Sequence, residues 1–71
     1  MTRWFVQWDT TGDPMVVARV RDEADGPIPE VWDGSTWTYW PAVSSFLVDP
    51  LAADRVDEAT AVAAAKQLSD Q

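Results

Sequence analysis

An aromatic stretch lies in the middle of this 71-residue chain, at residues 30–41, and reads EVWDGSTWTYWP. It contains three of the five tryptophans and the only tyrosine, placed around the turn-forming residues Asp33-Gly34-Ser35. Aromatic and β-branched residues on both sides of an Asp-Gly turn are typical of a β-hairpin. We therefore expect a hairpin here, with aromatic side chains at the centre of a small core.

The hairpin has more than one possible register. A two-residue loop at Gly34-Ser35, or a four-residue loop from Asp33 to Thr36, places Trp32 directly opposite Trp37. A type I′ turn one residue earlier places Glu30 opposite Trp37 instead. We favour the registers that pair the tryptophans, because contact between two large aromatic faces stabilises more than a Glu–Trp contact.

Alternation along the second strand of this hairpin puts aromatic side chains on both of its faces. Trp37 and Tyr39 fall on one face, and Trp40 falls on the other with Thr36 and Thr38. One face is therefore expected to be core, and the other to be covered by something else. Pro41 is expected to end the strand, since proline lacks the N–H that a ladder requires.

Two strands are expected before this hairpin. Residues 3–9 and 15–22 alternate in hydrophobicity, and the turn-forming cluster at 10–14 between them predicts an antiparallel hairpin. Trp4, Val6 and Trp8 share a face of the first strand, opposite Arg3, Phe5 and Gln7; Val16, Ala18 and Val20 share a face of the second, opposite Val17, Arg19 and Arg21. Residues 23–29 are interpreted as a polar loop, because Gly26-Pro27 breaks regular structure.

Helical patterns follow the strands. A short helix is expected from Pro41 to Val48, where Val43, Phe46 and Leu47 lie on one helical face. The strongest helix signal covers residues 56–67, with Asp57 as N-cap and Val56 before it as a hydrophobic staple. Its expected apolar stripe is narrow and consists of Ala61, Val62, Ala65 and Leu68. A stripe built mostly of alanine allows close approach to a sheet but buries little area per residue.

These elements predict one small α+β domain, residues 1–71. We expect an antiparallel four-stranded meander of two hairpins, followed by a short helix and a C-terminal helix packed on the sheet. A domain of this size buries only about 60% of the surface of its unfolded chain. Such domains usually add a disulfide, a metal or a partner chain, and cysteine is absent here. The tryptophans and self-association are then the remaining sources of added stability.

Charge and composition narrow the function classes. The net charge is −7, with 12 acidic and 5 basic residues, which disfavours direct binding to nucleic acid or to an anionic membrane. Histidine is absent, so the commonest general base and metal ligand is missing. The chain shows no leader pattern and no apolar run long enough to cross a bilayer, and we expect a cytoplasmic protein.

The candidate binding residues are Trp32, Trp37, Tyr39 and Trp40, since tryptophan and tyrosine dominate binding hot spots. The alternative interpretation is that most of them form the core, although five tryptophans are hard to bury in so short a chain. The carboxylates include no D-x-D-x-D-G run and are interpreted as solubilising charges. The serines have no histidine to activate them. We expect no catalytic residues, no metal and no cofactor.

The whole chain resembles a type of small protein found in actinobacteria and their phages. The resemblance is carried by Met1-Thr2-Arg3-Trp4 at the start, by Trp32-Asp33-Gly34 in the central hairpin, and by residues 56–61, which read VDEATA. It implies a W-D-G hairpin followed by an acidic C-terminal helix, and it implies no function.

The sequence thus favours a non-enzymatic protein-interaction module that acts through an acidic surface containing aromatic side chains. It could be phage-encoded or an accessory or inhibitory factor, and its expected partner is another protein or a second copy of itself. Two alternatives belong to other classes. One is a structural subunit of an assembly such as a virion, and the other is a carbohydrate-binding module that stacks sugars on exposed Trp or Tyr rings.

Overall fold

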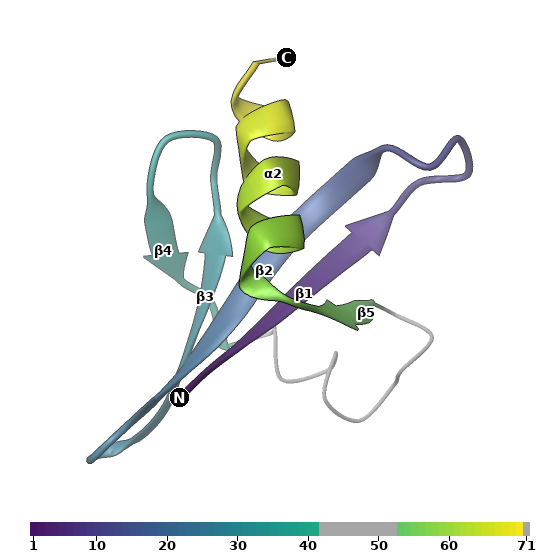
Figure 1. The fold of residues 1–71 in the computed structure, drawn as a ribbon. Coiled ribbons are helices and arrows are strands. Elements are labelled where there is room, and N and C mark those ends of the chain that lie inside the picture. Colours follow the sequence, from purple (N-terminus) through teal and green to yellow (C-terminus); the bar gives the residue numbers. More distant parts are fainter. Residues whose placement is uncertain (42–52, 71) are drawn as a thin grey trace.

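The computed structural model describes residues 1–41 and 53–70. These residues form an α+β fold, in which a helix crosses one face of a five-stranded antiparallel sheet (Figure 1). The elements are β1 (Thr2–Trp8), β2 (Pro14–Glu23), β3 (Gly26–Trp32), β4 (Trp37–Tyr39), β5 (Asp54–Val56) and α2 (Glu58–Ser69). The strand order β4-β3-β2-β1-β5 contains the predicted meander of four consecutive strands.

The predicted four-stranded meander does not include β5, and Val56, expected at the start of the helical segment, is the last residue of this strand. This strand pairs with β1 in the register Trp4↔Val56 and Val6↔Asp54, and it forms one edge of the sheet. A strand of three residues is too short to show the two-residue alternation by which strands are recognised. Its pairing with β1 is a tertiary contact between segments far apart in the sequence.

The predicted polar loop at residues 23–29 is wrong, because β3 begins at Gly26. Glu23 pairs with Gly26, so β2 and β3 are joined by a tight turn, and the φ of +119° at Gly26 suits that reversal. The prolines of β3 remove no hydrogen bond from the β2 ladder. The carbonyl of Pro29 accepts from the Trp40 N–H at 2.9 Å, so Pro29, and Pro27 two residues before it, face the β4 side.

The central hairpin has the favoured register. Trp32 lies opposite Trp37 and Glu30 lies opposite Tyr39, so the alternative that paired Glu30 with Trp37 is wrong. Residues 33–36 connect the strands, with Gly34 at a φ of +105°. The Asp33 N–H donates to the Thr36 carbonyl at 3.1 Å. Glycine is needed at this position because positive φ strains residues with a side chain.

The C-terminal helix is confirmed, and it begins at the predicted cap. The Asp57 carboxylate accepts from the Thr60 N–H at 2.8 Å, and α2 runs from Glu58 to Ser69. Two details of the expected stripe are wrong. Ala64 is buried together with Ala61 and Ala65, whereas Val62 is 51% exposed. The helix lies on β1 and β2 through its alanine face, which turns Val62 toward its flank.

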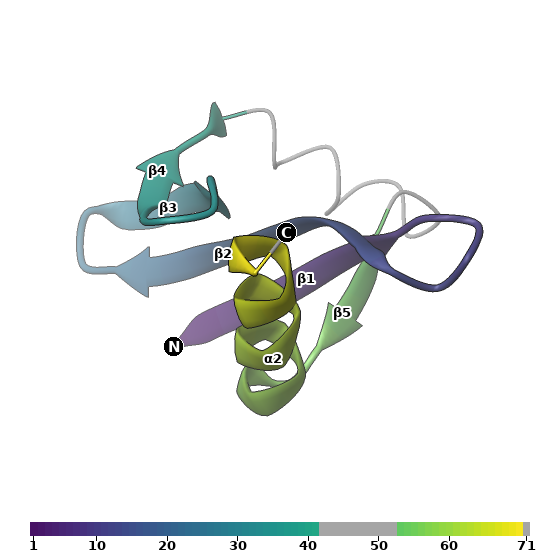
Figure 2. The ribbon, with the colours of Figure 1, turned by 90° about the horizontal axis from the view of Figure 1, so that it is seen from above.

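Apolar side chains form a cluster on each face of the sheet. The cluster under α2 contains Val6, Val17 and the helix alanines, with Trp4, Trp32, Trp37, Val56 and Leu68 packed around it. The cluster on the opposite face contains Phe5, Ala18, Val20 and Ala53, with Val16 and Trp40 beside it. Figure 2 shows α2 confined to one face. These memberships confirm the alternation predicted for the first two strands.

The predicted helix at Pro41–Val48 falls almost entirely on residues 42–52, which lie outside the described residues. In the part of the chain that is described, no helix has the length and apolar character needed to span a membrane.

Candidate binding surface

The structure divides the four predicted binding residues between the faces of the sheet. Trp32 and Trp37 lie together on the face that carries α2, whereas Trp40 packs on the opposite face against the Phe5 cluster. Tyr39 belongs to the edge strand β4 and is 64% exposed. Trp37 and Trp40 therefore cannot contribute to a single stacking platform.

Trp32 and Trp37 are held in place by several contacts. Their ring centroids are 5.3 Å apart, and Trp37 meets Trp4 edge to face at 5.8 Å. The Trp32 indole N–H donates to the Ser69 hydroxyl at 2.9 Å, and Ser69 donates to the Ala65 carbonyl. The central hairpin is thereby tied to the last turn of α2.

A buried carboxylate fixes the arginines beside these rings. Glu30 Oε1 accepts from the Nε atoms of Arg19 and Arg21, both at 2.8 Å. The guanidinium of Arg19 then lies 4.2 Å from the centroid of Trp37, within the range of a cation–π contact. Burial raises the pKa of Glu30, but the hydrogen bonds and charges of Arg21 and Arg19 outweigh it, so the pKa lies below its ordinary value.

A groove of about 320 Å³ is lined by Trp32 and Trp37 on one side and by one flank of α2 on the other. Its lining consists of Trp32, Trp37, Val62, Ala65, Lys66 and Ser69. We call it the Trp32/Trp37 groove. Its walls are apolar, and its charged side chain is Lys66, which is the only lysine of the chain.

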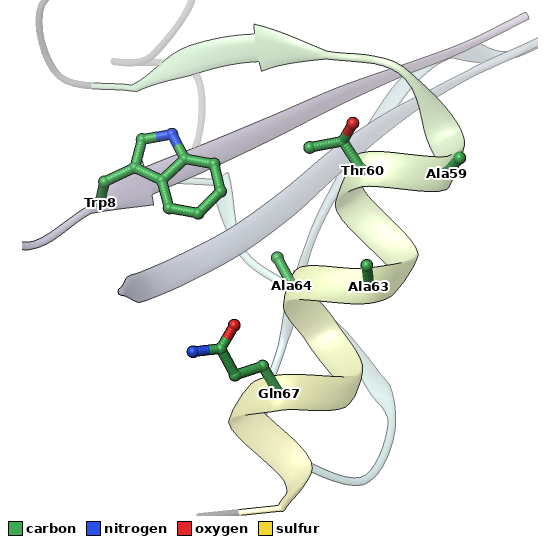
Figure 3. A pocket seen from close by; sticks show the side chains of 6 residues that line it. All are labelled: Trp8, Ala59, Thr60, Ala63, Ala64 and Gln67. Atoms are coloured by element: carbon green, nitrogen blue, oxygen red, sulfur yellow. The ribbon is translucent and has the colours of Figure 1, made fainter. Parts of the chain in front are cut away.

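A second groove, of about 390 Å³, lies along the other flank of α2 (Figure 3). Its lining consists of Trp8, Ala59, Thr60, Ala63, Ala64 and Gln67. We call it the Trp8 groove. Figure 3 shows the Trp8 ring on one side and the small side chains of the helix on the other. With about 3.6 residues per turn, the helix positions of this groove and those of the Trp32/Trp37 groove point to different flanks.

The Trp8 groove ends at an acidic loop that is tied to the helix. Gln67, a lining residue, donates from Nε2 to Asp13 Oδ1 at 3.2 Å. Asp9 Oδ1 accepts from the backbone N–H groups of Thr11 and Asp13, at 2.8 and 2.9 Å, and from the Thr11 hydroxyl. These hydrogen bonds lower the pKa of Asp9 and keep it charged, and the bond from the Thr11 hydroxyl has the largest effect.

The turn of the central hairpin is organised in the same way. Asp33 accepts from the N–H groups of Thr36 and Ser35, both at 2.9 Å, and from the Thr38 hydroxyl at 3.0 Å. These bonds lower the pKa of Asp33 to about 2, from an ordinary 3.8. The order of the causes is the backbone N–H of Thr36, then that of Ser35, then the Thr38 hydroxyl. An aspartate therefore anchors a loop next to each groove.

The basic side chains on the sheet are mostly neutralised internally. Arg3 pairs with Asp22 at 2.9 Å, Arg19 pairs with Glu30, and Arg21 pairs with both Glu23 and Glu30. Neither groove lining contains an arginine. Within residues 1–41 and 53–70, no three His, Cys, Asp or Glu side chains gather as potential metal ligands.

Trp8 was not among the predicted binding residues. Strand alternation placed it only on the same face as Trp4 and Val6. The ladder shifts register between Gln7 and Trp8, and Trp8 is 37% exposed where the strand ends. Its position next to a turn-forming cluster was a signal that this side chain lies at the rim of the sheet.

No family model matches the chain, and no match is found among curated proteins or among solved structures.

Proposed function

We propose that this chain is a non-enzymatic protein-interaction module, and that the face carrying α2 binds a basic, amphipathic segment of a partner protein. The observation that supports it is a pair of apolar grooves along the flanks of α2, each walled by tryptophan, in a chain of net charge −7. Partly exposed tryptophans beside small side chains provide concave apolar surface for an inserted side chain.

The charge of the chain favours a basic partner over a second copy. Two copies would each bring a net charge of −7 to the contact, and like charges disfavour association. On the face that carries α2, Arg19 and Arg21 are already paired with Glu30 and Glu23, so they offer little net positive charge against a basic segment. A cytoplasmic location, expected from the sequence, is part of this proposal.

The experiment uses matched helical peptides as probes. One peptide carries leucine on one face and arginine and lysine on the other, and its counterpart carries glutamate in place of every basic residue. We expect the basic peptide to change the tryptophan fluorescence and the acidic one to leave it unchanged. Binding should weaken as salt reduces the Debye length from about 10 Å at 0.1 M to about 3 Å at 1 M.

Two results would contradict the proposal. One is equal binding of both peptides, because charge complementarity would then play no part. The other is a concentration-dependent rise in mass by light scattering that abolishes the peptide signal, because the face would then be occupied by a second copy of the chain.

A further inference from the structure

We infer that the Trp8 groove is the subsite for an arginine side chain of the partner, which stacks its guanidinium on Trp8 and directs it toward Asp13. This inference rests on the proposed function and assigns the cationic residue of the partner to one of the grooves. It depends on differences in charge and in ring contacts between the Trp8 groove and the Trp32/Trp37 groove.

The ring of Trp37 already has a cation beside it. Arg19 lies 4.2 Å from its centroid and is fixed there by Glu30, so a second guanidinium would meet a like charge. Lys66 adds another positive charge to the lining of the same groove. The Trp32/Trp37 groove is therefore suited to an uncharged apolar side chain.

The Trp8 groove has the opposite character. Its lining contains no lysine or arginine, and the described cation–π contacts involve Trp4 and Trp37 but not Trp8. Asp13 is one hydrogen bond away from the lining residue Gln67, and Asp9 lies in the same loop. An indole face beside carboxylates is an arrangement that binds a cation.

The small side chains opposite Trp8 leave room for an aliphatic stem. Ala59, Ala63 and Ala64 line the helix side of the groove, as Figure 3 shows, and they offer methyl groups to methylenes. Arginine fits this site better than lysine, because its planar guanidinium stacks on a ring and pairs with a carboxylate at the same time.

The test uses four peptides that differ at a single position, which holds arginine, lysine, citrulline or glutamate. The measured signal is the indole N–H resonance of each tryptophan in the intact chain. We expect the arginine peptide to shift the Trp8 resonance and to bind about fivefold more tightly than the citrulline peptide, in line with an exposed cation–π contact. The lysine peptide should fall between them, and the glutamate peptide should bind weakest.

Two charge-matched variants serve as test and control. Asp13→Asn keeps an acceptor for Gln67 and removes the charge next to the groove, so it should reduce the arginine preference about threefold. Asp25→Asn removes the same charge from the turn between β2 and β3, at the other end of the sheet from the Asp13 loop (Figure 1), and should retain the preference. Trp8→Leu should remove it, and the resonances of the other tryptophans report whether that variant remains folded.

The outcomes separate this inference from the proposed function. If the arginine peptide binds but shifts only Trp32 and Trp37, or if citrulline binds as tightly as arginine, the arginine subsite at Trp8 is wrong and the interaction module stands. If none of the four peptides shifts any indole resonance, both the inference and the proposed function fail.

Discussion

The tryptophans on the two flanks of α2 differ in the contacts that they make. On one flank, Trp32 is bonded to Ser69, and Trp37 is enclosed by Trp4, Trp32 and Arg19. On the other flank, Trp8 faces a groove, is 37% exposed, and shows no ring contact with another described aromatic. The first arrangement joins the hairpin to the helix, and the second leaves an indole available to a ligand.

Residue type alone therefore does not separate core from surface in this small domain. Within residues 1–41 and 53–70, the fully buried side chains are Val6, Val17 and Val20 together with alanines, whereas each of the five tryptophans is at least partly exposed. The tryptophans surround the core and determine its edges. Whether a given tryptophan has a structural role or is available for binding depends on the hydrogen bonds and charges of its polar neighbours.

The largest expected effect tests the structural role of the Trp32/Trp37 flank. Trp37→Ala should lower the free energy of unfolding by about 3–5 kcal/mol, because it removes packing against two indoles and a guanidinium. Trp8→Ala should lower it by about 1 kcal/mol. Urea unfolding followed by circular dichroism measures both. Equal losses would remove the distinction between the two flanks.

The next effect tests the buried carboxylate of Glu30, which holds Arg19 beside the Trp37 ring. Glu30→Ala should cost about 2 kcal/mol, because it leaves Arg19 and Arg21 without their shared acceptor. Glu23→Ala, which removes only an exposed partner of Arg21, should cost little. Urea unfolding of both variants makes the comparison. A loss at Glu23 as large as that at Glu30 would show that burial of the acceptor is unimportant.

A smaller effect tests the hydrogen bond that links the central hairpin to α2. Trp32→Phe removes the N–H that Ser69 accepts and should cost about 1 kcal/mol. Adding Ser69→Ala should then cost less than it does alone, since the bond is already absent. A double-mutant cycle from urea unfolding measures this coupling. Full additivity would mean that the Trp32–Ser69 bond does not hold α2 against the hairpin.

The smallest effect is the pH dependence of stability that Asp33 contributes in the turn between Trp32 and Trp37. The pKa of Asp33 is about 2 in the fold and 3.8 ordinarily, so the unfolded chain binds this proton first as the pH falls. Its stabilisation is complete above 3.8 and is lost as the pH falls toward 2. Asp33→Asn should therefore make the unfolding free energy less dependent on pH in this window. Asp25→Asn serves as the charge-matched control and should retain the dependence seen in the unmodified chain.

Several structural features could be predicted because they depend on neighbours in the sequence. The pairing of Trp32 with Trp37 follows from a short turn containing Gly34, and the start of α2 follows from the capping carboxylate of Asp57. Residues 26–29 of β3 were predicted as a loop because of Gly26-Pro27, and they fit a strand because the missing N–H groups of the prolines point away from β2. The strand β5 was missed because β1 is its only strand partner among the described residues.

The two predicted hairpins, the alternation of their faces and the capped alanine-rich helix follow from the sequence, because turns, two-residue alternation and caps act over a few neighbouring residues. The assignment of Trp8 to one groove and of Trp32 and Trp37 to the other required the packed fold. That choice depends on the line along which α2 crosses the sheet. The close approach of Ala61, Ala64 and Ala65 sets that line and leaves Trp8 and the Trp32–Trp37 pair on opposite flanks.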